Sequence, residues 1–167
     1  INLKEGVVLQ DEIQYRDGES RKIEQETRLT VINMVLSTLR NGGQALIFAS
    51  TRKNAVSAAK LVASHMDKVL IPKSGSKLVK KSIEEQTRGV LEKEAHKILD
   101  AGEHTGMSDE LAELVRCGVA YHHAGLSGAH RKIIEDSFKN RKIKVLTATP
   151  TLAWGVNLPA RTVIIQD

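Results

Sequence analysis

Near the end of the chain, residues 145–165 place a hydroxyl-rich turn and a glycine between two apolar runs. Val145 and Leu146 belong to the first run, which predicts a buried strand. Three threonines at alternate positions then follow where that strand ends, and Thr162 begins a second apolar run. Open α/β sheets bind ligands at the carboxyl ends of their strands. The segment therefore predicts a parallel sheet with a hydroxyl-lined edge.

The turn between these runs has features of a phosphate site. Pro150 favours the first turn of a helix, which makes Thr149 a candidate N-cap for a short turn over 150–154. Free N–H groups at a helix N-terminus attract phosphate. Gly155 permits a sharp reversal of the backbone, and Asn157 offers a side-chain amide. The alternative is an ordinary crossover between two strands that binds nothing.

Predicted strands and helices alternate over most of the chain. Apolar runs predict strands at 45–49, 118–121 and 143–147, and Ser or Thr caps open the helices that follow the first two. This alternation predicts an α/β fold, a mostly parallel sheet with helices on both faces. The 167 residues suit a single compact domain with a sizeable core.

Two regions depart from this alternation. Val7–Tyr15 and Arg21–Ile23 flank Asp17-Gly18, which predicts one hairpin. Residues 66–107 start with a lysine-rich linker, Lys73–Lys81, and continue as a long amphipathic helix with mixed charge outside. We interpret them as a helical insertion. It is either a solvated helical hairpin or a basic track for the second strand of a duplex.

Three segments resemble motifs of one helicase family, in the same order along the chain. Residues 147–160, Thr-Ala-Thr-Pro-Thr-Leu-Ala-Trp-Gly-Val-Asn-Leu-Pro-Ala, resemble motif V of superfamily 2 helicases, in the form of the Ski-like branch and of archaeal DNA-repair helicases of the Hjm type. Residues 45–56 resemble motif IV, and residues 119–131 resemble the His-Ala-Gly-Leu segment between these motifs. The resemblance covers nearly the whole chain. It departs at Trp154, where relatives usually have a small residue.

This resemblance implies a RecA-like fold and the second motor domain of an ATP-dependent 3′-to-5′ DNA helicase, acting in DNA repair and replication-fork processing. It implies that six residues hold the backbone of the tracking strand: Ser50, Thr51, Arg52, His123, Gly125 and Thr149. Gly155 and Asn157 would face the ATP cleft. ATP and Mg²⁺ would be held mainly by a first RecA-like domain of the same parent chain. The expected partner is single-stranded or forked DNA, and we expect a monomer.

Motifs of that first domain have no match here. Ser74–Leu78 resembles a phosphate-binding loop only in part, because Lys77 lacks the preceding glycine and the following hydroxyl. Asp11–Gln14 spells an acidic box, but no such loop precedes it. The arginine-finger motif of the family would come after Asp167. We therefore expect both Walker motifs and the arginine finger to lie outside these residues, and the isolated chain to hold no catalytic residue.

Composition agrees with a nucleic-acid partner. The net charge of +5 favours a polyanion, although Lys and Arg are spread along the chain. Aromatic residues make up only 3%, so contacts should fall on phosphates and sugars rather than on stacked bases. His122 and His123 are neighbours on an extended segment, where side chains point in opposite directions, and no ligand pattern accompanies them. We predict no metal site.

Other features limit the location and leave alternatives open. A single cysteine, Cys117, rules out an internal disulfide, and no apolar run approaches the roughly 20 residues that span a bilayer. We expect a soluble, cytoplasmic protein without a membrane partner. The alternatives are the equivalent domain of a Ski-like RNA helicase and a non-catalytic RecA-like nucleic-acid-binding module. For Arg161, a surface position, an interdomain ion pair and a nucleotide contact all stay open.

Overall fold

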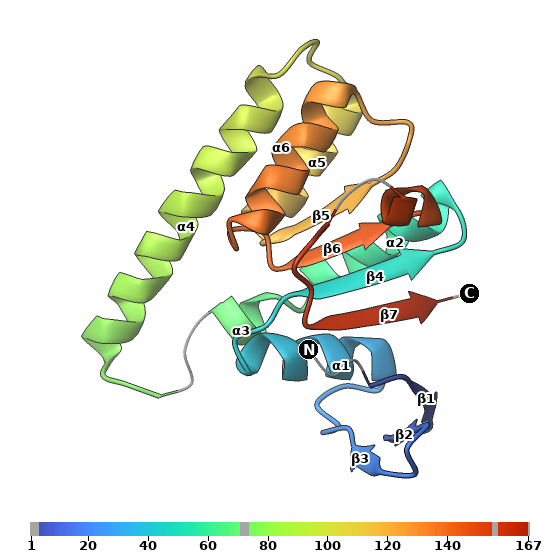
Figure 1. Ribbon diagram of the computed structural model, residues 1–167. Helices are drawn as coiled ribbons and strands as arrows, with labels where there is room; N and C mark the ends of the chain where they lie inside the picture. Colours follow the sequence, from blue (N-terminus) through green and yellow to red (C-terminus); the bar gives the residue numbers. More distant parts are fainter. Residues whose placement is uncertain (1–3, 71–73, 155–156, 167) are drawn as a thin grey trace.

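A four-stranded parallel sheet organises the molecule, in the order β5-β6-β4-β7 (Figure 1). The computed structural model describes residues 4–70, 74–154 and 157–166, with the backbone alone at 153 and 154. The strands are β4 (Ala45–Ala49), β5 (Val119–His122), β6 (Val145–Ala148) and β7 (Thr162–Gln166). Three of them match the predicted strands to within a residue or two. The predicted α/β fold is thus confirmed.

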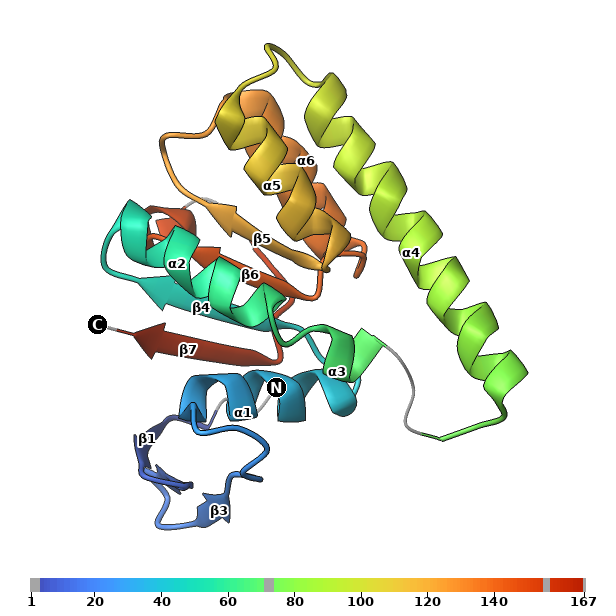
Figure 2. The same ribbon diagram turned by 180° about the vertical axis from the view of Figure 1, so that it is seen from behind.

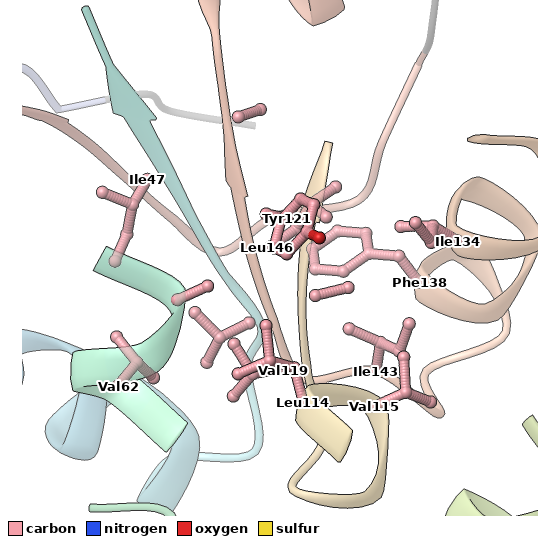
Figure 3. Close-up of a cluster of buried hydrophobic side chains, with 14 of the residues drawn as sticks. Ile47, Val62, Leu114, Val115, Val119, Tyr121, Ile134, Phe138, Ile143 and Leu146 are labelled. Atoms are coloured by element: carbon pink, nitrogen blue, oxygen red, sulfur yellow. The ribbon is translucent and has the colours of Figure 1, made fainter. Parts of the chain in front are cut away.

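Helices cover both faces of this sheet (Figures 1 and 2). On one face lie α1 (Thr30–Arg40), α2 (Arg52–Ala63) and α5 (Gly106–Arg116), and on the other lies α6 (Gly128–Lys139). Figure 3 shows the buried cluster that joins these layers, with Val62 of α2 on one side of the strands and Phe138 of α6 on the other. Apolar side chains on both faces of the strands are typical of a parallel sheet.

Thr147 links β6 to α2. Its hydroxyl is fully buried and donates to the carbonyl of Ala55 at 2.7 Å. We expect Thr147→Val, which keeps the shape and removes the donor, to lower the free energy of unfolding by about 1 kcal/mol. Urea unfolding of the complete protein measures this change. Thr162→Val serves as a comparison, because it removes the hydroxyl on the outer strand β7 that accepts a hydrogen bond from Thr38.

The predicted insertion holds α3 (Asp67–Leu70) and α4 (Lys77–Asp100), a helix longer than predicted. The predicted end of the linker at Lys81 is wrong, because the helix already begins at Lys77, where Ser76 caps it by accepting the N–H of Val79 at 3.3 Å. The C-terminal half of α4 lies beside α5 and α6, whereas its N-terminal half extends away from the domain (Figures 1 and 2). In the described part of the chain, no helix is long and apolar enough to cross a membrane.

Charge pairs on the extending half of α4 argue against a basic track there. Arg88 lies 2.5 Å from Glu84, and Lys81 lies 3.9 Å from Glu85. These pairs are one helical turn apart, the spacing at which opposite charges on a helix surface attract. Much of the positive charge is thus balanced within the helix itself, as in a solvated helical face.

A small antiparallel sheet precedes α1. It consists of β1 (Gly6–Leu9), β2 (Glu12–Tyr15) and β3 (Ser20–Lys22). The hairpin at Asp17-Gly18 is confirmed as the β2–β3 connection, but the single strand predicted over residues 7–15 is wrong. Gln10 adopts a φ of 55°, which turns the chain back and makes two strands of it.

Arg161 has a structural role at the opposite end of the sheet from the predicted site. Its Nη1 donates to the carbonyl of Asn41 at 2.9 Å, just after α1. Its aliphatic stem crosses Gly43, where a Cβ atom would lie 2.5 Å from Arg161 Cδ. Gly43 therefore permits a close approach that no larger residue allows there without a shift. Arg161 holds the turn between α1 and β4.

Candidate nucleic-acid interface

The carboxyl ends of three neighbouring strands meet at one edge of the sheet. β6 lies between β5 and β4, with Ala148 opposite both His122 and Phe48. The segments that follow these strands begin at Ser50, His123 and Thr149. Six of the predicted site residues are thereby gathered at a single edge. Gly155 lies outside the described residues, and Asn157 is exposed.

The N-terminus of α2 presents hydroxyls and positive charge. Thr51 caps the helix by accepting the backbone N–H of Asn54 at 3.1 Å, and Ser50 Oγ accepts from Asn54 Nδ2 at 3.3 Å. Because both hydroxyl oxygens act as acceptors, their O–H groups stay free to donate to another molecule. Arg52 and Lys53 are exposed, and the first turn holds no acidic residue. This end of the helix suits an anion.

The loop after β5 lies against Arg52. A Cβ atom at Gly125 would lie 3.3 Å from Arg52 Nη1 and 3.0 Å from the ring of His123. The backbone N–H of Gly125 donates to His123 Nδ1 at 3.0 Å. Ala124 and Gly125 are exposed, whereas the His123 side chain is almost fully buried. The accessible part of this loop is therefore its tip, next to the guanidinium.

The His123 ring is held from below by Tyr121. The two rings are stacked, with centroids 5.3 Å apart and planes 8° from parallel. The Tyr121 hydroxyl donates to Glu110 Oε1 at 3.2 Å, and Lys60 lies 2.7 Å from the same carboxylate. Burial raises the pKa of Tyr121, with a further contribution from Glu110. The phenol therefore stays protonated and continues to donate.

The second histidine points to the opposite face of the sheet. His122 Nε2 lies 2.8 Å from Glu135 Oε1 on α6. Adjacent residues of a strand alternate between the two faces, so His122 and His123 cannot bind one ion together. Within the described ranges, no group of three or more His, Cys, Asp or Glu side chains could hold a metal.

Thr149 is more enclosed than its predicted role requires, with only 9% of its surface exposed. Its backbone N–H donates to the carbonyl of His122 at 3.2 Å, and its hydroxyl lies 3.0 Å from that of Thr151. The predicted helical turn exists as a 3-10 helix, η1 (Pro150–Trp154), and the N–H of Leu152 donates to the Thr149 carbonyl. Thr149 joins the ends of β5 and β6.

Two residues that support the site were not singled out from the sequence. Asn54 bonds both hydroxyls at the start of α2, and Tyr121 supports the His123 ring. The signal for Tyr121 was available, because residues two apart on a strand share a face. Asn54 stands three positions after the cap, where side chains commonly reach back toward it.

Comparison with protein families identifies the chain. Residues 77–167 match the model of the helicase conserved C-terminal domain, and that match covers more than half of the chain. The chain belongs to this family. In this helicase C-terminal domain, the site described above thus lies at the carboxyl edge of a RecA-like sheet.

Two curated relatives are similar in sequence over nearly the full length of the domain. The ATP-dependent DNA helicase Hel308 of Methanocella arvoryzae is 42% identical over 165 residues, or 99% of this chain. The helicase of the same name from Caldivirga maquilingensis is 35% identical over 168 residues, or 100% of the chain. These similarities confirm the predicted resemblance to archaeal superfamily 2 DNA helicases. The helicase C-terminal domain spans 20% of the length of either relative.

Proposed function

We propose that this domain is the C-terminal motor domain of an ATP-dependent DNA helicase, and that its carboxyl edge binds the backbone of the strand along which the motor moves. The observation that carries the proposal is the close approach of the Arg52 guanidinium to Gly125, which brings a helix N-terminus next to an exposed loop from a different strand. Similarity to two helicases named for DNA supports DNA as the substrate.

The exposed groups at this edge suit a phosphate backbone. The Ser50 and Thr51 hydroxyls donate to phosphate oxygens, and the Arg52 guanidinium pairs with one phosphate. The tip of the loop at Gly125 lets the strand approach closely. Contacts of this kind position a nucleic acid without reading its bases, which a motor that moves along any sequence requires. Thr149, being buried, contributes by holding η1 in place.

Nucleotide binding and direction belong to the same proposal. We assign Asn157, which is exposed, to one wall of a nucleotide cleft. Gly155 lies outside the described residues and belongs to this proposal through its motif alone. The sequence has no phosphate-binding loop, so ATP and Mg²⁺ are held mainly by a first RecA-like domain. The complete protein is a cytoplasmic monomer that moves 3′ to 5′ on single-stranded or forked DNA during repair and fork processing.

The test is ATP hydrolysis by the complete protein without nucleic acid, with single-stranded DNA and with single-stranded RNA. We expect DNA to stimulate hydrolysis strongly and RNA to stimulate it little. A stronger response to RNA would replace the proposal by a Ski-like RNA helicase. Absence of hydrolysis under all three conditions would leave a nucleic-acid-binding module.

A further inference from the structure

We propose that His123 is a positioning residue, which shapes the DNA-binding loop as a neutral imidazole and does not itself contact DNA. The inference rests on the proposed function of this edge and assigns a different task to one of its residues. Tyr121 is the second residue in this arrangement, because its stacked ring fixes the plane of the imidazole. Three features of the structure support this assignment.

Accessibility is the first feature. His123 is only 5% exposed, whereas its neighbours Ala124 and Gly125 are exposed. A strand that lies on the loop therefore meets the backbone of Ala124 and Gly125 together with the Arg52 guanidinium. The imidazole lies beneath this surface, between the Tyr121 ring and the loop backbone.

Hydrogen-bond direction is the second feature. A backbone N–H can only donate, so the 3.0 Å contact from Gly125 requires an unprotonated Nδ1 on His123. The ring proton of the neutral imidazole then belongs on Nε2. Protonation of Nδ1 would replace this acceptor by a second donor facing the Gly125 N–H. The loop geometry is thus compatible with one tautomer of the neutral ring.

Surrounding charge is the third feature. Burial lowers the pKa of His123 most, and the charges of Arg52 on α2 and His122 on β5 lower it further. Two carboxylates on the neighbouring helices have other partners, since Glu135 on α6 bonds His122 and Glu110 on α5 bonds Tyr121 and Lys60. The positive charge at this edge therefore comes from Arg52 and Lys53 and not from His123.

A matched pair of variants separates positioning from direct contact. In His123→Asn the amide oxygen can occupy the place of Nδ1 and accept the Gly125 N–H, whereas His123→Gln places its amide near Nε2. We expect the Asn variant of the complete protein to keep its affinity for single-stranded DNA. The Gln variant should bind roughly fivefold more weakly, as expected for the loss of one hydrogen bond. The reverse order would show that Nε2 contacts DNA and would overturn the proposal.

The same titration distinguishes this inference from the proposed function. Arg52→Ala should weaken binding whatever His123 does, so an unchanged affinity in that variant would contradict the DNA site itself. Weaker binding by Arg52→Ala with equal affinities in the two His123 variants would contradict positioning alone. Acidification from pH 8 to about 6 should strengthen binding no more in the wild type than in His123→Asn; a gain confined to the wild type would indicate a protonated, DNA-contacting imidazole.

Nitrogen NMR gives a readout that does not depend on affinity. Histidine labelled with ¹⁵N in the complete wild-type protein, assigned by through-bond correlation of the His123 ring to its own backbone, reports which ring nitrogen carries the proton. We expect the Nε2–H tautomer at neutral pH. Should both variants fail to fold, this measurement decides alone, because an Nδ1–H tautomer or an imidazolium would overturn the proposal.

Discussion

Replacement of Arg52 by alanine is expected to weaken binding of single-stranded DNA by the complete protein about tenfold, equivalent to ~1.4 kcal/mol. The guanidinium is exposed at the start of α2 and lies against Gly125, so its loss leaves the edge without its central cation. Charge-assisted bonds to phosphate are among the stronger polar contacts in proteins, which is why the expected effect is large. Fluorescence anisotropy at several salt concentrations measures it.

The salt dependence identifies the cause of this loss. Removing one phosphate contact on a single strand should reduce the slope of log affinity against log salt by about 0.7. Lys139→Ala is the matched control, because it also removes one positive charge but lies at the end of α6, at the opposite edge of the sheet. Equal losses of affinity in the two variants would mean that net charge, and not the site, governs binding.

Replacement of Lys97 and Lys142, the two lysines that pair with Glu94, is expected to lower the free energy of unfolding by about 3 kcal/mol at neutral pH. Glu94 on α4 is only 3% exposed, and Lys97 and Lys142 each place Nζ 2.9 Å from its Oε1. Methionine at both positions keeps a long, unbranched side chain but removes its charge, so the buried carboxylate loses both partners. Thermal or urea unfolding of the complete protein measures the change.

The pH dependence of the same double variant follows from the pKa of Glu94. Burial alone would raise that pKa, but hydrogen bonds from Lys142 and Lys97 outweigh it and hold the pKa below its usual value. A carboxylate whose pKa is lowered by folding stabilises the protein above its unfolded pKa, about 4.3, and this contribution disappears as the pH falls through the folded value. The difference in free energy of unfolding between wild type and double variant should therefore become smaller as the pH falls.

A neutral amide at the centre of this cluster provides the control. Glu94→Gln added to the two methionines removes the unpaired charge, so it should recover part of the lost stability and flatten the pH dependence. If the difference in free energy of unfolding between wild type and double variant stays constant from about pH 3 to 7, the ion pairs contribute little.

Local patterns in the sequence were enough to predict the sheet and its helices, because buried strands and capped helices leave short-range signals. Ser127 caps α6 as expected, accepting the N–H of His130 at 3.0 Å. The error at Gln10 has a physical reason, since glutamine seldom adopts a positive φ and no glycine or asparagine marks the turn. The early start of α4 was hidden because Ser76 belongs to a Gly-Ser segment typical of linkers.

Positions in the site were predictable, but their exposure was not. The resemblance to helicase motifs implied a shared role for Arg52, His123 and Thr149, and the strand order explains why they lie at one edge of the sheet. Whether a side chain at that edge is open or covered depends on contacts that form in the folded chain. For His123 the covering includes the Tyr121 ring, and for Thr149 it includes the turn that η1 makes. Both partners are close in sequence, but the stacking of the rings and the path of the turn are set by the folded backbone and not by the motif pattern.

The parallel pairing of β5, β6 and β4 has a consequence for folding. The edge that gathers residues 50–52, 123–125 and 149 is assembled from segments many residues apart, so it exists only once the sheet is complete. A ligand bound there adds its binding energy to the native state alone, about 2.7 kcal/mol at a hundred times its Kd. DNA should therefore slow hydrogen exchange throughout β4 and β6, at amides that it never touches.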